Sequence, residues 1–252
     1  MEPVILTDRA ALRALDDSPY LRLVLLEEAP VTGYAHGGAL LVLSRRPDGE
    51  PRGHGLGDPG ACAALLAFAR EEGLLAAGHW FNGPRGVAAG FEGRVHEWDF
   101  LWTESAPPEA PDAPEVLRLD GPTSAAEIDA VLDLALPESS IRPTDGKARG
   151  WFGIRVAGAL AAVAADESSP GFGVVSGIAV HPAHQGRGLG AALTAAVTRT
   201  LLAEHGITGL GVYSDNARAA ALYSRLGYRG TIARTAGRLA SSDSRVRGAI
   251  PG

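Results

Sequence analysis

The sequence predicts an α/β fold, a mixed sheet flanked by helices, and one continuous segment carries most of that prediction. Residues 174–180 form an apolar run typical of a buried strand. The run breaks at His181-Pro182, and apolar residues then recur at helical spacing from Leu189 to Leu201. Strands joined by tight turns precede this segment, and helices alternate with strands after it. This order favours helices packed around a mixed sheet.

Composition places the chain among globular proteins and excludes several function classes. Its 252 residues are 46% hydrophobic and 21% charged, enough to bury one large core or two modest ones. The net charge is -6 and no basic stripe is present, so nucleic acid is not an expected partner. No apolar run approaches the roughly 20 residues that cross a bilayer, and Met1-Glu2-Pro3 does not resemble the start of a signal peptide. We therefore expect a cytoplasmic protein with no membrane partner.

Cysteine and lysine are each represented by one residue, Cys62 and Lys147. A single cysteine excludes an internal disulfide and a cysteine-based metal cluster, and no metal is expected. Cys62 stands among alanines and leucines on a predicted helix, which favours a small buried hydrophobic side chain over a nucleophile. Arginine far outnumbers lysine, a composition that suggests GC-rich bacterial coding.

The first half is expected to contain helices over residues 8–15, 18–26 and 58–72, and a strand over 39–44 that turns at 46–49. Asp58 precedes a proline at the first helical position, the usual arrangement of a helix cap. Trp98, Phe100 and Trp102 alternate with other residues, which predicts a strand with an aromatic face. Such a face either lines a substrate pocket or packs into a core, and we favour the core.

A connector separates this half from the rest of the chain. Residues 105–114 contain four prolines and should be extended and fairly stiff. We therefore predict an N-terminal α/β domain over residues 1–104, the linker over 105–114, a second domain over 115–240 and a flexible tail over 241–252.

The second half has clearer patterns. Ser124 and Glu127 form the sequence signature of a capping box at the start of a helix that ends before Pro137. Strands are expected at 151–156 and 159–165, joined by a tight turn, and then at 174–180. After the long helix we expect a strand at 209–213, a helix at 216–226 and a closing strand at 228–235.

The turn between the central strand and the long helix reads Gln185-Gly-Arg-Gly-Leu-Gly190. Glycines let a ligand approach the backbone, and the free amides of a helix start favour an anion such as pyrophosphate. A plain glycine-rich turn is the alternative, since the chain holds 33 glycines. The dinucleotide fingerprint and the Walker loop do not fit, because the first needs a different position in the fold and the second needs Gly-Lys-Ser/Thr.

Two motifs resemble the GNAT superfamily of N-acetyltransferases. One is Ile178-Ala179-Val180 followed by Gln-x-x-Gly-x-Gly, and the other runs from Asp215 to Tyr228 with Asn216 and Tyr223 seven residues apart. Residues 115–240 are similar to a GNAT catalytic domain in their element order. The chain as a whole is similar to an uncharacterised actinobacterial group of these enzymes with an extra N-terminal domain.

The resemblance implies acetyl-CoA as co-substrate and assigns roles to particular residues. Asn216 would contact the cofactor, although a simple helix cap is a strong alternative. Tyr223 would protonate the departing thiolate as general acid. The backbone of Ile178, Ala179 and Val180 would pair with the pantetheine arm, and the pyrophosphate would lie on Gln185, Gly186, Arg187, Gly188, Leu189, Gly190 and Ala191.

The general base is left open. Some relatives carry a glutamate five residues before the motif asparagine, and this chain has Gly211 there. Asp166, Glu167, His181 and Tyr213 remain candidates, each directly or through water.

Two functions are compatible with these features. The first is an N-acetyltransferase that acts by direct attack of a small-molecule or peptide amine in a ternary complex. The second is a non-catalytic acyl-CoA-binding sensor or interaction module.

The segment Arg52–Gly57 is similar in sequence to Gln185–Gly190, which suggests a degenerate GNAT-like repeat in the first half. Because Asp58 would repel phosphate there, we expect the first half to be a scaffold or lid. The oligomeric state, a homodimer included, is open.

Overall fold

A computed structural model describes residues 2–25, 30–45, 49–120 and 122–241. The described chain divides into two compact units. The first comprises the described residues of 1–99, 213–215 and 232–252, and the second comprises those of 100–212 and 216–231. In the described part, no helix is long and apolar enough to cross a membrane.

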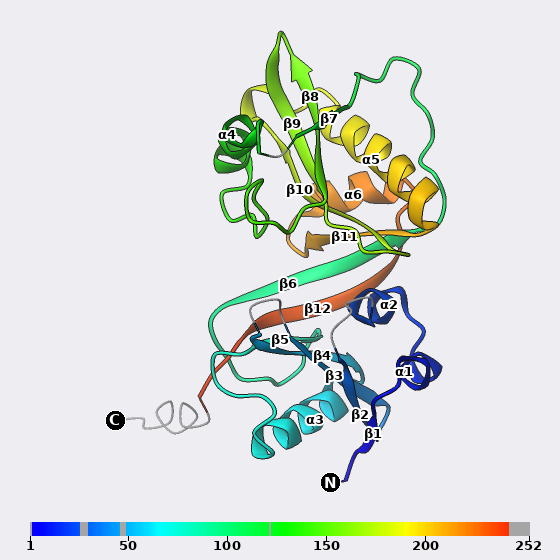
Figure 1. Ribbon diagram of the computed structural model, residues 1–252, viewed down its shortest axis with the longest axis vertical. Helices are drawn as coiled ribbons and strands as arrows, with labels where there is room; N and C mark the ends of the chain where they lie inside the picture. The colour runs from blue at the N-terminus through cyan, green and yellow to red at the C-terminus, as the bar shows by residue number, and fades with distance from the viewer. Residues whose placement is uncertain (1, 26–29, 46–48, 121, 242–252) are drawn as a thin grey trace. The chain divides into compact units, whose positions relative to one another are not determined.

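The first unit places helices on both faces of its strands (Figure 1). The longest of these helices, α3, starts where the sequence predicts, because the Asp58 carboxylate accepts the Ala61 N–H at 2.8 Å. On the inner side of α3, Cys62 is buried against the sheet, as expected. The elements of this half are β1 (Val4–Leu6), α1 (Arg9–Leu15), α2 (Pro19–Leu25), β2 (Thr32–His36), β3 (Ala39–Arg45), β4 (Pro51–Gly57), α3 (Pro59–Glu71), β5 (Trp80–Pro84) and β6 (Phe91–Thr103).

The second half of the chain confirms the predicted order of helix, three strands, helix, strand, helix and strand. One helix, α4, packs on one face of its sheet, and α5 and α6 pack on the other (Figure 1). A short strand that the sequence did not indicate, β7, precedes them. The elements are β7 (Leu117–Leu119), α4 (Ala125–Ala135), β8 (Gly150–Val156), β9 (Ala159–Asp166), β10 (Gly173–Val180), α5 (Leu189–His205), β11 (Thr208–Tyr213), α6 (Ala217–Arg225) and β12 (Arg229–Leu239).

The predicted capping box at the start of α4 is wrong. Ser124 makes no side-chain cap, and the Glu127 carboxylate instead accepts hydrogen bonds from both terminal nitrogens of Arg155 at 2.7 Å. Such a two-pronged ionic contact is stronger than a neutral cap bond.

The predicted aromatic strand is part of β6. Phe100 is fully buried there and the two tryptophans are half-buried, in agreement with a core role. The tail beyond Ser241 and residues 46–48 of the predicted turn lie outside the described residues.

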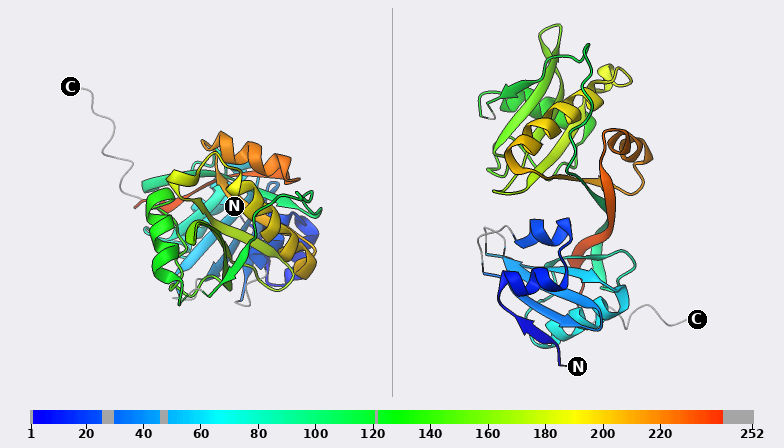
Figure 2. Two further views of the ribbon diagram at one scale, coloured as in Figure 1. Left: turned by 90° about the horizontal axis from the view of Figure 1, so that it is seen from above. Right: turned by 90° about the vertical axis from the view of Figure 1, so that its right-hand side faces the viewer.

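Strand pairing joins the two halves of the sequence. The strands of the described chain form one sheet in the order β1-β2-β3-β4-β5-β12-β6-β11-β10-β9-β8-β7. Read from its two ends, this order is the same for β1–β5 as for β7–β11. The sixth strand of each half lies next to the fifth strand of the other half. In the right-hand view of Figure 2, β12 follows directly after α6.

The sequence echo between the halves is not a structural equivalence. Residues 52–57 belong to β4 and pair with β3 along their whole length, whereas residues 185–188 form a turn. By strand order, β4 corresponds to β10, and helix α3 follows it after a single residue, Asp58. The first half therefore lacks a glycine-rich turn before its helix.

The sequence boundary at 105–114 stays a prediction, and a pair of fragments tests it. We expect a fragment of residues 90–240 to unfold cooperatively and one of residues 115–240 not to. The shorter fragment lacks β6, the neighbour of β11, and with it Leu101, which is buried in the core under α5. Thermal denaturation followed by far-UV circular dichroism measures this. Equal cooperativity of the two fragments would place the boundary in the linker after all.

Candidate functional site

The centre of the second unit is a place where two parallel strands separate. β10 and β11 pair at Gly173↔Thr208, Val174↔Gly209 and Val175↔Leu210, and no further pair joins them within the described chain. On its other edge, β10 stays paired with β9 as far as Val180, across a bulge between Ser176 and Ala179. The edge of β10 that faces β11 is therefore open from Ser176 to Val180. An extended ligand with amide groups can pair with such an edge as an added strand does.

The turn after β10 leads to a helix start without a side-chain cap. Gly186 and Gly188 both have φ of 78°, a left-handed conformation that favours glycine, and no atom lies within 4 Å of where their Cβ atoms would be. The first helical bond is from the Ala192 N–H to the Gly188 carbonyl at 3.0 Å. The N–H groups of residues 189–191 therefore have no partner within the helix. Together with the helix dipole they form a site for an anion.

Two side chains of this turn bond within the turn or back to β10. The Arg187 guanidinium donates to Nδ1 of His184 at 3.0 Å, so this ring nitrogen acts as an acceptor. The Gln185 amide donates to the Val180 carbonyl at 3.3 Å and ties the turn to the end of the strand. Arg187 is exposed on the turn, where its charge adds to that of the helix start.

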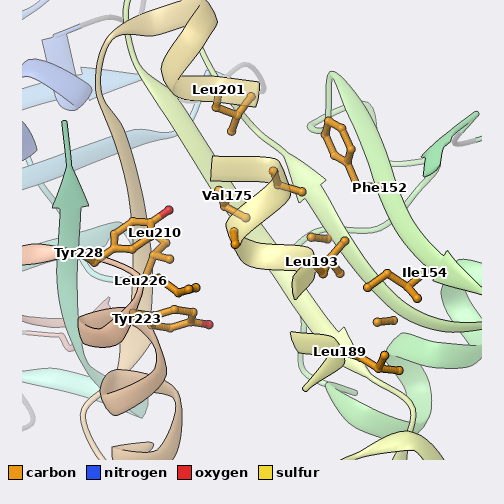
Figure 3. Close-up of a cluster of buried hydrophobic side chains, with 14 of the residues drawn as sticks. Phe152, Ile154, Val175, Leu189, Leu193, Leu201, Leu210, Tyr223, Leu226 and Tyr228 are labelled. Atoms are coloured by element: carbon orange, nitrogen blue, oxygen red, sulfur yellow. The ribbon is translucent and has the colours of Figure 1, made fainter. Parts of the chain in front are cut away.

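Tyr223 projects from α6 into the core shared with α5. Its side chain is 8% exposed, and burial raises its pKa to about 12. Its hydroxyl is not among the fully buried polar atoms that lack a partner in the described chain, and no hydrogen bond to another residue holds it. In Figure 3 the rings of Tyr223 and Tyr228 lie beside each other, and both hydroxyls point toward the side of the cluster that α5 contributes with Leu193 and Leu201.

Asn216 begins α6 as its cap. Its side-chain oxygen accepts the Ala219 N–H at 3.0 Å, and the residue is exposed. Asn216 therefore makes the contact that the alternative hypothesis, a simple helix cap, predicts. Asn216 and Tyr223 differ in surroundings, because the first is in solvent and the second in the core.

Three of the four base candidates make other contacts. Asp166 is 1% exposed; its Oδ1 accepts the Ser168 N–H at 3.0 Å, whereas its Oδ2 is buried without a hydrogen bond in the described chain and lies 4.0 Å from an Arg149 nitrogen. The Nδ1 of His181 accepts the Ala183 N–H at 3.2 Å, so the proton of the neutral ring is on the other nitrogen. Tyr213 is 40% exposed and stacks on His96 with 5.9 Å between ring centroids.

Glu167, the fourth candidate, lies beside the strand separation. Its carboxylate accepts the Ser176 hydroxyl at 2.7 Å, and Ser176 is the first β10 residue after the last pair with β11. Strand alternation places Ser176 and Gly211 on the face opposite Val175 and Leu210, which both pack under α5. Sequence reasoning missed the role of Ser176; the one available signal was a polar residue within an apolar run.

The corresponding region of the first unit is different. Asp58 caps its helix, and a buried polar cluster lies behind β4. In that cluster the hydroxyl of Tyr20 and Nδ1 of His54 are 2.9 Å apart, and Arg234 donates to the Asn82 side chain at 3.1 Å. Burial, with the nearby arginine charges, holds the pKa of His54 well below its ordinary value. The Asp58 carboxylate therefore occupies the helix start that an anion would need.

No group of three or more His, Cys, Asp or Glu side chains in the described ranges is arranged to hold a metal ion. The groups that the site does present are the backbone amides, Tyr223 and the Glu167–Ser176 pair. These groups suit acyl transfer from a phosphate-bearing donor, in which amides hold the anion and a hydroxyl supports a leaving group.

Comparison with known proteins agrees with that chemistry. The model of the acetyltransferase (GNAT) family matches residues 97–228. A solved GNAT-family protein from Novosphingobium aromaticivorans DSM 12444 is 29% identical with a TM-score of 0.57, over 82% of this chain and 90% of that one. A GCN5-related N-acetyltransferase from Sphaerobacter thermophilus has a TM-score of 0.59 at 14% identity, over 96% of this chain and 97% of that one. One from Kribbella flavida has a TM-score of 0.52 at 20% identity, over 96% of this chain and 100% of that one.

The last two identities are low enough that the likeness concerns the fold alone. A search of curated proteins found no match. The family model, in contrast, spans more than half of the chain and includes the strand separation, the glycine turn and Tyr223. This chain belongs to the GNAT acetyltransferase family.

Proposed function

We propose that the chain is an N-acetyltransferase that moves an acetyl group from acetyl-CoA to an amine of a small molecule or peptide. The amine attacks directly, in a ternary complex. The observation that carries the proposal is the separation of β10 and β11, with an uncapped helix start following β10 and Tyr223 lying in the core shared with α5. A binding site for the cofactor needs the first two features, and the chemistry needs the third.

The residues that would hold acetyl-CoA follow from the open backbone groups. The open edge of β10 at Ile178, Ala179 and Val180 offers N–H and C=O groups to the amides of the pantetheine arm. The amides of residues 189–191 and the turn at residues 185–188 would hold the pyrophosphate. Asn216 would contribute the half of its amide that does not cap α6. When bound, the cofactor supplies a thioester as acyl donor.

Tyr223 and Glu167 would divide the proton chemistry between them. The Tyr223 hydroxyl would donate toward the leaving sulfur. Glu167, oriented by the Ser176 hydroxyl, would take the proton of the attacking ammonium on the other face of the sheet, where Gly211 is exposed. Acid and base then lie on opposite sides of the strand separation, so the two cannot neutralise each other directly.

A non-catalytic acyl-CoA-binding module is the second candidate. Gly211 supports it, because some relatives carry a glutamate base at this position and glycine has no side chain that could act as a base. Tyr223 at its motif position argues against it, since binding alone does not require this residue. The two candidates predict opposite outcomes for the Tyr223 variant below.

The first half is proposed to be a degenerate GNAT-like repeat that acts as a scaffold or substrate lid. Its support is the strand order, which repeats from the two ends of the sheet. The capping carboxylate of Asp58 leaves no free helix start for a second cofactor.

The cofactor assignment is tested by placing a negative charge in the proposed pyrophosphate cradle, which is the turn at residues 185–188 with the amides of residues 189–191. Asn and Asp both tolerate the left-handed conformation of Gly188 and nearly share a shape, so Gly188→Asp and Gly188→Asn differ chiefly in charge. We expect calorimetry to find CoA bound at least 10-fold more weakly by the Asp variant, about 1.4 kcal/mol. Equal affinities of the two variants would remove the pyrophosphate from this turn.

The acid is tested by Tyr223→Phe, which keeps the ring and removes the proton. We expect kcat to fall about 100-fold or more, with the Kd of acetyl-CoA nearly unchanged. Because the pKa of Tyr223 is raised to about 12, the hydroxyl keeps its proton and the wild-type rate should show no decline from this group below about pH 11. Full activity of the variant would refute the acid, and lost acetyl-CoA affinity would make Tyr223 a binding residue.

The base is tested by Glu167→Gln, with Asp166→Asn as the matched control on the opposite face. We expect kcat/KM at neutral pH to fall about 100-fold for the first variant and little for the second. The deficit should shrink as pH rises toward the amine's own pKa, because the free amine then needs no base. A pH-independent deficit, or an equal one in the control, would exclude Glu167 as the base.

A further inference from the structure

A short chain of buried hydroxyl groups joins α5 to the end of α6. The Thr198 hydroxyl contacts the Thr194 carbonyl at 2.7 Å and the Tyr228 hydroxyl at 2.8 Å. A threonine hydroxyl has one proton, and the carbonyl can only accept. The Tyr228 hydroxyl must therefore donate to Thr198. Burial raises the pKa of Tyr228, so this donor proton is present at any ordinary pH.

Tyr228 also holds Tyr223 in two ways. Its backbone N–H donates to the Tyr223 carbonyl at 3.0 Å, in the turn that ends α6. Its ring lies 6.0 Å from the Tyr223 ring, tilted by 59°. Tyr228 thus contacts the proposed acid through backbone and ring, and contacts α5 through its hydroxyl.

The same helix begins at the proposed pyrophosphate cradle. Thr198 stands nine residues after Leu189, about 14 Å along a rigid α-helix. The distance between the cradle and the Tyr223 hydroxyl therefore depends on how α6 is attached to α5. The Thr198–Tyr228 bond is a direct polar link between the two segments in the core under α5.

We propose that Tyr228 is a positioning residue for acetyl transfer: its hydrogen bond to Thr198 sets the place of the Tyr223 hydroxyl relative to the start of α5. The inference rests on the proposed role of Tyr223. It goes beyond that role, because a phenylalanine at position 228 would fill the core equally well. Small displacements of a reacting group lower rates steeply, about 100-fold for 1 Å.

The test compares Tyr228→Phe in two backgrounds. The substrates are acetyl-CoA and one primary amine, chosen as the one that the wild-type chain acetylates fastest in a panel of amino acids, polyamines, arylalkylamines and peptides. The rate is measured as the release of the free CoA thiol. We expect Tyr228→Phe to lower kcat about 10-fold with little change in acetyl-CoA Kd. In the Tyr223→Phe background the same substitution should have no further effect, since residues that act as one unit are not additive.

Threonine variants give a matched check from the other side of the bond. Thr198→Val removes the acceptor of the Tyr228 hydroxyl and should reproduce the loss in kcat. Thr200→Val is the control, because the exposed Thr200 hydroxyl bonds only to the Ala196 carbonyl of its own helix at 3.1 Å. It should leave kcat unchanged.

The outcomes separate this inference from the function on which it rests. An active Tyr228→Phe beside an impaired Tyr223→Phe overturns the positioning role alone. An equal loss from Tyr228→Phe in both backgrounds, with a lowered Tm, overturns it in favour of a structural role. Full activity of Tyr223→Phe overturns the acid and the positioning role together.

Discussion

Pairing between β10 and β11 stops after three residues, and the other features of the second unit can be understood from that interruption. Backbone N–H and C=O groups need partners, so an open edge in the middle of a sheet is costly unless something occupies it. The bulge at Gly177, with φ of 57°, lets β10 bend while β9 keeps hold of its other edge. The strand therefore stays in place, and the edge toward β11 is available to a ligand. The free amides at the start of α5 follow directly at its end.

A strand held so briefly on one side needs support on the other, and the sheet order provides it. β11 has β6 as its second neighbour, and β5, which pairs with β4 over only three residues, has β12. Each of these supporting strands comes from the other half of the chain. The acetyltransferase half therefore depends on residues before the proline-rich linker, which agrees with a family match that begins at residue 97. The first half therefore contributes β6, the neighbour of β11, to the sheet, whether or not it binds a cofactor of its own.

The sequence predicted features that depend on neighbouring residues and missed those that depend on distant ones. The apolar run of β10, the period of α5 and the motif around Tyr223 are local patterns, and the corresponding elements are where they were expected. Ser124 and Glu127 carry a local pattern too, but Arg155, far away in sequence, captures the glutamate. The Glu167–Ser176 and Thr198–Tyr228 contacts join elements that meet only after folding. Three-residue β7 is too short for a periodic signal.

The pKa of Tyr223 constrains what its hydroxyl can do. A thiol has a pKa near that of free cysteine, roughly 8.5, so full transfer from a phenol of pKa about 12 is uphill by about 5 kcal/mol. In the proposed role the Tyr223 hydroxyl would therefore act by donating a hydrogen bond to the negative charge that develops on sulfur, and complete proton transfer to the thiolate is not required of it. Such a donor is effective only if it is already aimed before the charge appears, because its benefit depends on preorganisation. In this proposed role Tyr223 would be more sensitive to its attachment than to its acidity, so the contacts that hold it are expected to matter as well.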